Sequence, residues 1–167
     1  TSFGLGTNAY GSASASGAHN TVIGNIAGSS LTSGSHNVFV GSRAGEDSAT
    51  GKYNVGIGYN ALGAVVANTL IGNVGIGINA LATLTSGDGN VAIGDQALNS
   101  TTTGSENVAL GASAGRDAVG RTLIAIGSAA GYYLSGSNNT AIGPQSLQLA
   151  RGHRNTAIGY RSGASGV

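Results

Sequence analysis

The sequence predicts an all-β protein: a single β-solenoid domain over residues 1–167, with about ten coils of 16–19 residues. Two registered columns of residues and the short repeat length indicate this fold. The first column is the glycine that ends the motif Asn90 to Gly94, and its copies are spaced 16 to 19 residues apart. These motif glycines are Gly6, Gly24, Gly41, Gly58, Gly77, Gly94, Gly111, Gly127, Gly143 and Gly159.

The second column is a glycine that lies three residues before the motif asparagine. Only the connection into Asn73 lacks it. A repeat of this length accommodates short strands and turns, but not a strand, a helix and their loops. Coils stacked ~4.8 Å apart would form a rod of roughly 45–50 Å, in which each coil contacts its neighbours. The corner glycines are Gly17, Gly34, Gly51, Gly87, Gly104, Gly120, Gly136 and Gly152.

The composition excludes several classes of protein. Glycine accounts for 31 of 167 residues and charged residues for 8 %, but the regularly placed Val and Ile argue against a disordered chain. A net charge of +1 leaves no electrostatic footprint for nucleic acid. No apolar run approaches the ~20 residues of a membrane-spanning helix, so we expect no membrane insertion by this segment. The absence of Met and of a signal peptide suggests a fragment of a longer fibrous protein.

Each motif predicts one short strand that is apolar on both faces. With the motif glycine as position 0, positions −3 and −1 are mostly Val, Ile or Leu, and position −2 is Gly or Ala except at Val22 and Phe39. Strands that are apolar on both faces are buried on both sides. Because a single thin coil has only one buried side, we expect another chain or another layer to cover the second face.

After the glycine we expect a second short strand, with small residues at position +3 facing a narrow interior. Position +4 is leucine in some coils and glycine in others. In several glycine coils a bulky residue follows three or four places later, which would keep the apolar volume of each coil roughly constant. These compensating residues are Leu31, Val119 and Leu134.

The asparagine that opens the motif predicts a ladder of stacked side-chain amides along the rod. A structural ladder is favoured over a row of ligand-binding groups. The stretch from 63 to 72 is irregular, because residues 68–72 match the motif five residues early and leave the register ambiguous. The ladder residues are Asn20, Asn37, Asn54, Asn73, Asn90, Asn107, Asn139 and Asn155.

The motif copies from Asn90 to Ala97 and from Asn139 to Ser146 resemble the head repeats of trimeric autotransporter adhesins, the YadA-like family. They are also similar to repeats of phage tail fibres and tail spikes, to which Asn155 to Tyr160 is the nearest match. The resemblance covers essentially the whole chain. It implies a left-handed parallel β-roll, a homotrimer, surface exposure and a role in attachment, and it carries over no catalytic residue.

Motifs that would indicate enzyme chemistry are weak. The stretch from Gly56 to Ala61 matches a dinucleotide fingerprint, but the repeat has no room for the helix that the fingerprint requires. The stretch from Gly45 to Lys52 is one residue too long for a P-loop. Asp88, Asp95 and Glu106 fall on neighbouring coils, yet scattered surface charges are the simpler interpretation. We therefore expect no catalytic residue, no cofactor and no metal.

Histidine and tyrosine side chains are the candidates for surface contact. His19 and His36 occupy the same column in successive coils, where stacking would place their rings ~5 Å apart, and Tyr53 continues the column. Exposed tyrosines stack on sugars or fill protein interfaces, and Tyr132 and Tyr133 are the first candidates. The predicted contact residues are Tyr132, Tyr133, Tyr59, Tyr160, His19 and His36.

The sequence thus favours a structural and attachment segment of a homotrimeric extracellular fibre, whose partner would be a host surface protein or a glycan. An adhesin anchored at the outer membrane and a phage tail fibre or tail spike both remain open. A polysaccharide depolymerase with its site between subunits is less favoured, because paired carboxylates are scarce. An ice-binding solenoid is also less favoured, since threonine recurs at position −3 only at Thr21, Thr140 and Thr156.

Overall fold

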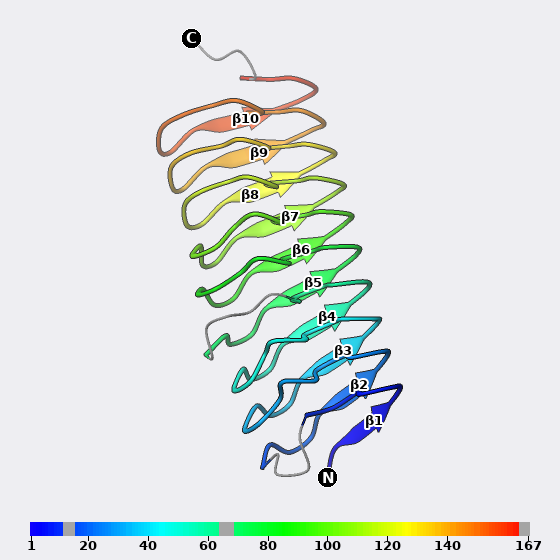
Figure 1. Cartoon of the computed structure of the whole chain (residues 1–167). Helices are drawn as coiled ribbons and strands as arrows, with labels where there is room; N and C mark the ends of the chain where they lie inside the picture. The colour runs from blue at the N-terminus through cyan, green and yellow to red at the C-terminus, as the bar shows by residue number, and fades with distance from the viewer. Residues whose placement is uncertain (12–15, 64–68, 164–167) are drawn as a thin grey trace.

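The computed structural model is a β-solenoid of ten short parallel strands in one sheet, with no helix among the described residues, 1–11, 16–63 and 69–163. Figure 1 shows the coils stacked in chain order into a rod, with the two termini at opposite ends. The strands are β1 (Phe3–Leu5), β2 (Thr21–Ile23), β3 (Val38–Val40), β4 (Val55–Ile57), β5 (Val74–Ile76), β6 (Val91–Ile93), β7 (Val108–Leu110), β8 (Ile124–Ile126), β9 (Thr140–Ile142) and β10 (Thr156–Ile158).

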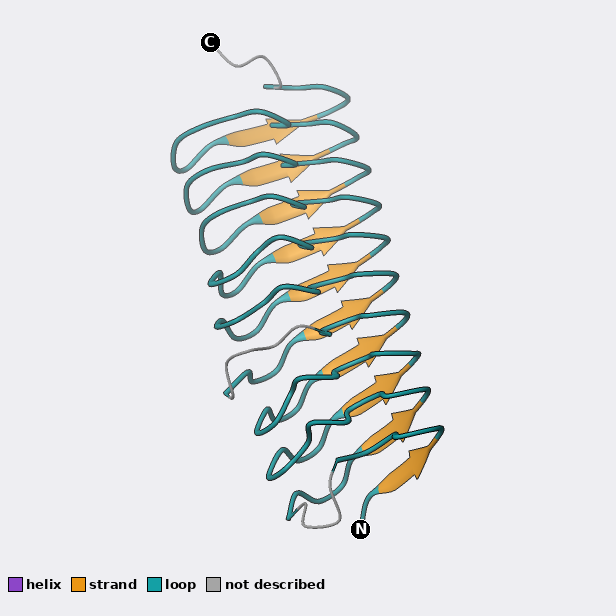
Figure 2. Ribbon diagram, viewed as in Figure 1, coloured by secondary structure: helices purple, strands orange, loops and turns teal. Residues whose placement is uncertain are grey.

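The register of the sheet follows the motif. Each strand pairs with the next one in the chain, and equal motif positions face each other, as Ala92 does Ala109 between β6 and β7. The predicted all-β solenoid and its ten repeats are therefore confirmed. Figure 2 shows the strands on one wall of the rod, with the return stretches forming the rest of each coil.

The two faces of each strand have opposite environments. The residue at position −2 faces the interior and is fully buried in β2 to β9, whether it is glycine, alanine, Val22 or Phe39. The residues at positions −3 and −1 face outward and are half-buried or exposed. The narrow interior thus takes the small face of the sheet, and the bulky face is left on the outside.

The predicted second strand after the glycine is wrong. The return stretch is a series of turns in which the residue at position +2 always has a left-handed backbone, even Ile26 with φ of 50°. N–H groups two residues apart there point in opposite directions along the rod: Gln96 donates to the Ile78 carbonyl one coil before, and Leu98 donates to the Ala114 carbonyl one coil after. The alternation connects the coils by hydrogen bonds without extended pairing.

The motif glycine is required because successive coils stack closely at the turn that directly follows each strand. At Gly94, φ is 137°, and a Cβ atom would lie 2.5 Å from the Gly111 carbonyl oxygen of the next coil. Half of the glycines that lie three residues before the motif asparagine also have positive φ, and the other half lie outside the left-handed region. The four with φ from 114° to 151° are Gly87, Gly120, Gly136 and Gly152.

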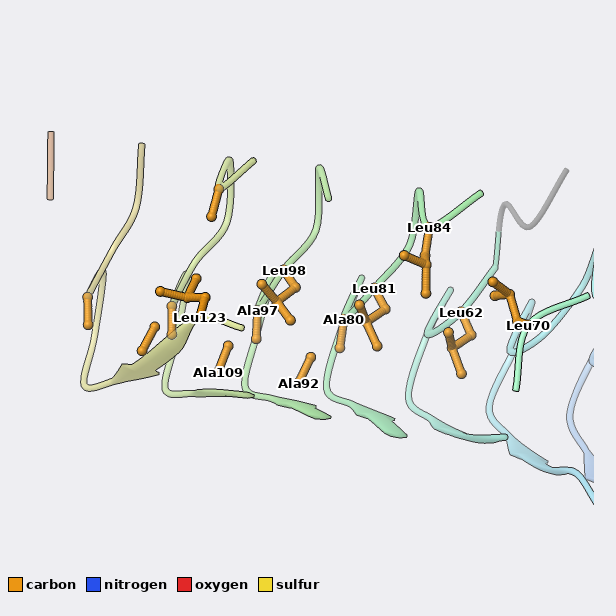
Figure 3. Close-up of a cluster of buried hydrophobic side chains, with 14 of the residues drawn as sticks. Leu62, Leu70, Ala80, Leu81, Leu84, Ala92, Ala97, Leu98, Ala109 and Leu123 are labelled. Atoms are coloured by element: carbon orange, nitrogen blue, oxygen red, sulfur yellow. The ribbon is translucent and has the colours of Figure 1, made fainter. Parts of the chain in front are cut away.

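The interior keeps its volume by exchanging large and small residues between positions. Phe39 fits because position +4 of its coil is Gly45, where a Cβ atom would lie 2.5 Å from the Phe39 ring. In other coils leucine at position +4 fills the interior, as Figure 3 shows for Leu62, Leu81 and Leu98. The compensating role predicted for Leu31 and Leu134 is confirmed by their burial.

The role predicted for Val119 is wrong. Its side chain is 65 % exposed, and Leu123 is buried instead, with its Cδ2 atom 3.0 Å from where a Cβ on Gly115 would lie. Leu123 occupies the asparagine column, so one step of the ladder is replaced by core volume. The backbone N–H of Leu123 still donates to Asn107 Oδ1, at 2.9 Å.

The irregular coil keeps the register of the motif that starts at Asn73. Strand β5 pairs with β4 through Val74 and Val55, so the earlier motif match does not form a strand in its described part, residues 69–72. Leu70 takes the place of the missing corner glycine, and its carbonyl accepts the side-chain amide of Asn54 at 2.8 Å. The rest of that match, Asn68, lies outside the described residues.

Candidate functional site: the outward face and the side-chain columns

One surface feature runs the whole length of the rod: the outward face of the sheet, defined as positions −3 and −1 of all ten strands. None of its side chains is charged. Ile93, near the middle of the rod, is 40 % exposed, and Ile158 at its end is 68 % exposed. Position −3 carries Phe3, Thr21, Val38, Val55, Val74, Val91, Val108, Ile124, Thr140 and Thr156, and position −1 carries Leu5, Ile23, Val40, Ile57, Ile76, Ile93, Leu110, Ile126, Ile142 and Ile158.

The asparagine column is a buried structural ladder, as predicted. Asn90 Oδ1 accepts both the backbone N–H and the side-chain amide of Asn107, at 3.1 and 3.0 Å. Asn90 Nδ2 donates in turn to Asn73 Oδ1 at 3.0 Å and to the Gly104 carbonyl at 2.9 Å. Because the side chains from Asn20 to Asn139 are buried, the ladder joins coils and presents no row of groups to a ligand.

The predicted histidine column is also present. The rings of His19 and His36 stack with centroids 4.8 Å apart, and Tyr53 continues the stack at 5.0 Å from His36. All three side chains are exposed. No group of three or more metal-ligating side chains occurs within the described ranges, so the two histidines lack the further ligands that a metal site requires.

The tyrosines predicted as contact residues fall into two places. Tyr132 and Tyr133 lie together on the return stretch after β8, with ring centroids 4.5 Å apart in an edge-on arrangement. Tyr59 and Tyr160 directly follow motif glycines, at the corner where the sheet ends, and both are exposed. The structure therefore brings Tyr132 and Tyr133 together and leaves Tyr59 and Tyr160 on separate coils.

Arg116 is a member of the tyrosine cluster that sequence reasoning missed. Its Nη1 donates to the Tyr132 hydroxyl, and its guanidinium carbon lies 5.4 Å from the Tyr132 ring centroid. Its Nε lies 4.0 Å from Asp117 Oδ2. The signal was available in the repeat, because Arg116 and Tyr132 are one coil apart, each five residues after its motif glycine.

Two of the carboxylates form hydrogen bonds that connect neighbouring coils or stabilise a turn. Asp88 Oδ1 accepts the Ile71 backbone N–H at 2.8 Å, and Glu46 Oε2 accepts Arg43 Nε at 2.7 Å. That contact is the main cause of the raised pKa of Arg43. These contacts connect or stabilise turns. Neither of them brings two carboxyl groups together to face a substrate.

Comparison with family models, with curated proteins and with solved structures finds no match to this chain. The part of the chain that the structure describes contains no helix of the length and apolar character needed to cross a membrane. The geometry of the chain itself, and above all its outward face, is therefore the guide to its function.

Proposed function

We propose that this chain is a structural and attachment segment of an extracellular fibre, in which three copies cover each other's outward faces. The observation that carries the proposal is the uncharged, bulky outward face that runs over all ten strands. Parallel sheets are normally covered on both faces. Here the solenoid interior covers one face, and other chains of the fibre cover the second.

The composition of the outward face favours contact with a protein partner over contact with water. Contiguous apolar surface on a soluble monomer is usually small, and larger patches mark interaction sites. Burying side chains such as Ile93 and Ile126 away from water stabilises by ~25 cal/mol for each Å² of apolar area. No charged residue interrupts the face, and its only polar side chains are Thr21, Thr140 and Thr156 at position −3.

Copies of the same chain are the partners that fit best. A second copy has side chains at the same coil spacing of ~4.8 Å, so its columns can interdigitate with those of the first along the whole rod. Closed symmetric assemblies of identical chains are also the commonest oligomers. The number three, the left-handed coil and the location on a cell surface or a virion tail follow from the resemblance to adhesin and tail-fibre repeats.

In such a fibre the rod would hold binding surfaces away from its base. The ladders and stacked turns make each coil depend on its neighbours, which gives a stiff support for binding surfaces on the return stretches. An adhesin segment and a receptor-binding or shaft segment of a phage tail fibre are both consistent with this mechanism.

A charge placed on the outward face tests the proposal. Ile93→Lys should convert the trimer to folded monomers, because three lysine ammonium groups would be buried without partners. Ser100→Lys, at an exposed position on the return stretch, is the matched control and should leave the assembly intact. Sedimentation velocity measures both. An Ile93→Lys protein that sediments like the unmodified chain would contradict the proposal.

A further inference from the structure

A second surface, on the return stretches after β7, β8 and β9, has the composition of a ligand site. We call it the aromatic wall and define it by Arg116, Asp117, Tyr132, Tyr133 and Gln148. The backbone fixes these residues in register: Asp117 N–H donates to the Tyr132 carbonyl, and Tyr133 N–H donates to the Gln148 carbonyl, both at 2.8 Å. Three adjacent coils thus present their side chains at a spacing of ~4.8 Å.

The aromatic rings of the wall are held in place before any ligand binds. Arg116 contacts both the hydroxyl and the ring face of Tyr132, and Asp117 lies beside the guanidinium. Tyr132 in turn packs edge-on against Tyr133, and such pairs prefer this geometry. Tyr133 itself remains 54 % exposed, so a fixed aromatic side chain is open to solvent. Little conformational entropy would be lost when a ligand binds to it.

The groups around Tyr133 match the chemistry of a sugar. A pyranose ring has an apolar face of C–H groups that packs on an aromatic ring, and hydroxyl groups at its rim that both donate and accept. The Asp117 carboxylate accepts, while the Gln148 amide does both. The Tyr133 hydroxyl, like any phenol at neutral pH, both donates and accepts. Arg116 and Asp117 balance in charge, which favours a neutral ligand over an anionic one.

The wall is separate from the outward face of the sheet. Tyr132 and Tyr133 belong to the return stretch, and the buried residues Ala125, Ala130 and Leu134 lie in the core between that stretch and the sheet. Covering the outward face with other chains therefore leaves the wall open. The coil spacing is also similar to the length of one hexose unit, and the next coil offers the exposed Leu149 as a further apolar contact.

We propose that the aromatic wall binds a neutral oligosaccharide, with one hexose packed on Tyr133 and its hydroxyls bonded by Asp117 and Gln148. The inference deepens the proposed attachment function and rests on it for its biological role. The binding itself requires only the single folded chain, because all five residues of the wall come from one copy.

The test uses the full chain on an array of neutral and acidic oligosaccharides, followed by titration calorimetry with the neutral oligosaccharide that is retained best. We expect retention on neutral hexose-containing glycans. Tyr133→Ala should weaken binding about tenfold or more, the loss expected when an aromatic contact is removed. Tyr53→Ala removes another exposed tyrosine outside the wall and should leave affinity unchanged. Circular dichroism confirms that each variant is folded.

Three results would overturn the inference: no glycan retained, retention of acidic glycans only, or an affinity that Tyr133→Ala does not change. Light scattering on the same samples separates this outcome from a failure of the proposed function. A monomer that binds neutral glycans through Tyr133 would refute the proposed trimer but support the sugar site. A trimer that binds no glycan would refute the sugar site but support the proposed trimer.

Discussion

The two faces of one strand show what each environment selects. On β8, Ala125 faces the interior and is completely buried, whereas its neighbours Ile124 and Ile126 face outward and are exposed. A soluble protein usually places its bulky residues inside and its small or polar residues outside. Here the interior is narrow, and glycine or alanine lies beneath the sheet except where Gly28 and Gly45 leave room for Val22 and Phe39. We propose that association with other chains, and not folding of the single coil, explains the bulky outward face.

The largest predicted difference comes from placing the same charge on the two faces. Ala125→Asp would bury a carboxylate in the interior without a partner, and we expect the loss of more than about 4 kcal/mol and of the folded state. Ile126→Asp should leave the chain folded while it abolishes assembly. Circular dichroism and sedimentation of both variants check this pair. A folded Ala125→Asp protein would mean that the interior is more open than the structure shows.

The next largest loss of stability is expected at the motif glycine, which directly follows the strand. Gly94→Val should cost more than about 3 kcal/mol in the free energy of unfolding, because its Cβ would lie 2.5 Å from the Gly111 carbonyl oxygen. Gly89→Ala is the control, since Gly89 also has positive φ but no atom within 4 Å of the added Cβ, and its cost should be about 1 kcal/mol. Urea denaturation at one fixed protein concentration measures both. Equal costs would show that backbone strain, not stacking, requires the motif glycine.

The asparagine ladder should give a smaller effect that depends on position. Asn90→Ala removes the acceptor of the Asn107 backbone N–H and a donor to the Gly104 carbonyl, which should cost about 2 kcal/mol. Asn155→Ala, at the half-buried end of the ladder, should cost less than about 1 kcal/mol. Thermal unfolding compares the two variants. A reversed order would contradict the role of burial in the ladder.

The smallest predicted effect is a change in one titration in the aromatic wall. Tyr132 is the main cause of the raised pKa of Tyr133, so Tyr132→Phe should move that pKa back towards its ordinary value of 10.0. Because the folded protein holds the Tyr133 proton more tightly than the unfolded chain, this stabilising contribution is present below pH 10 and is lost as the pH rises above it. Titration of the Tyr133 ring followed by NMR checks the shift.

The strands, their register and the ladder could be predicted from the sequence because they repeat the same residues at fixed intervals. Because the coils stack, residues at the same position of successive repeats lie next to each other. This also predicted the contact between His19 and His36. The residues that fill the interior were only partly predictable. Leu123 fills it from a position that otherwise carries asparagine. Val119 does not fill it, although nothing in the sequence pattern distinguishes Val119 from a core residue.

The return stretch could not be predicted, because its left-handed position +2 is never occupied by glycine. Ile26, Gln96 and Ala129 all adopt positive φ there, and none of these residue types indicates it. The hydrogen bonds between coils impose that backbone, and they exist only after the coils have stacked. Arg116 was missed although it and Tyr132 are one coil apart and each lies five residues after its motif glycine.

The most direct test of the account is the absolute mass of the unmodified chain in solution, measured by light scattering on a sizing column. The account predicts a mass three times the 16.1 kDa of the single chain, since three copies would cover the outward faces. A stable, folded species of 16.1 kDa would contradict it, because the face formed by positions −3 and −1 would then be open to water over its whole length.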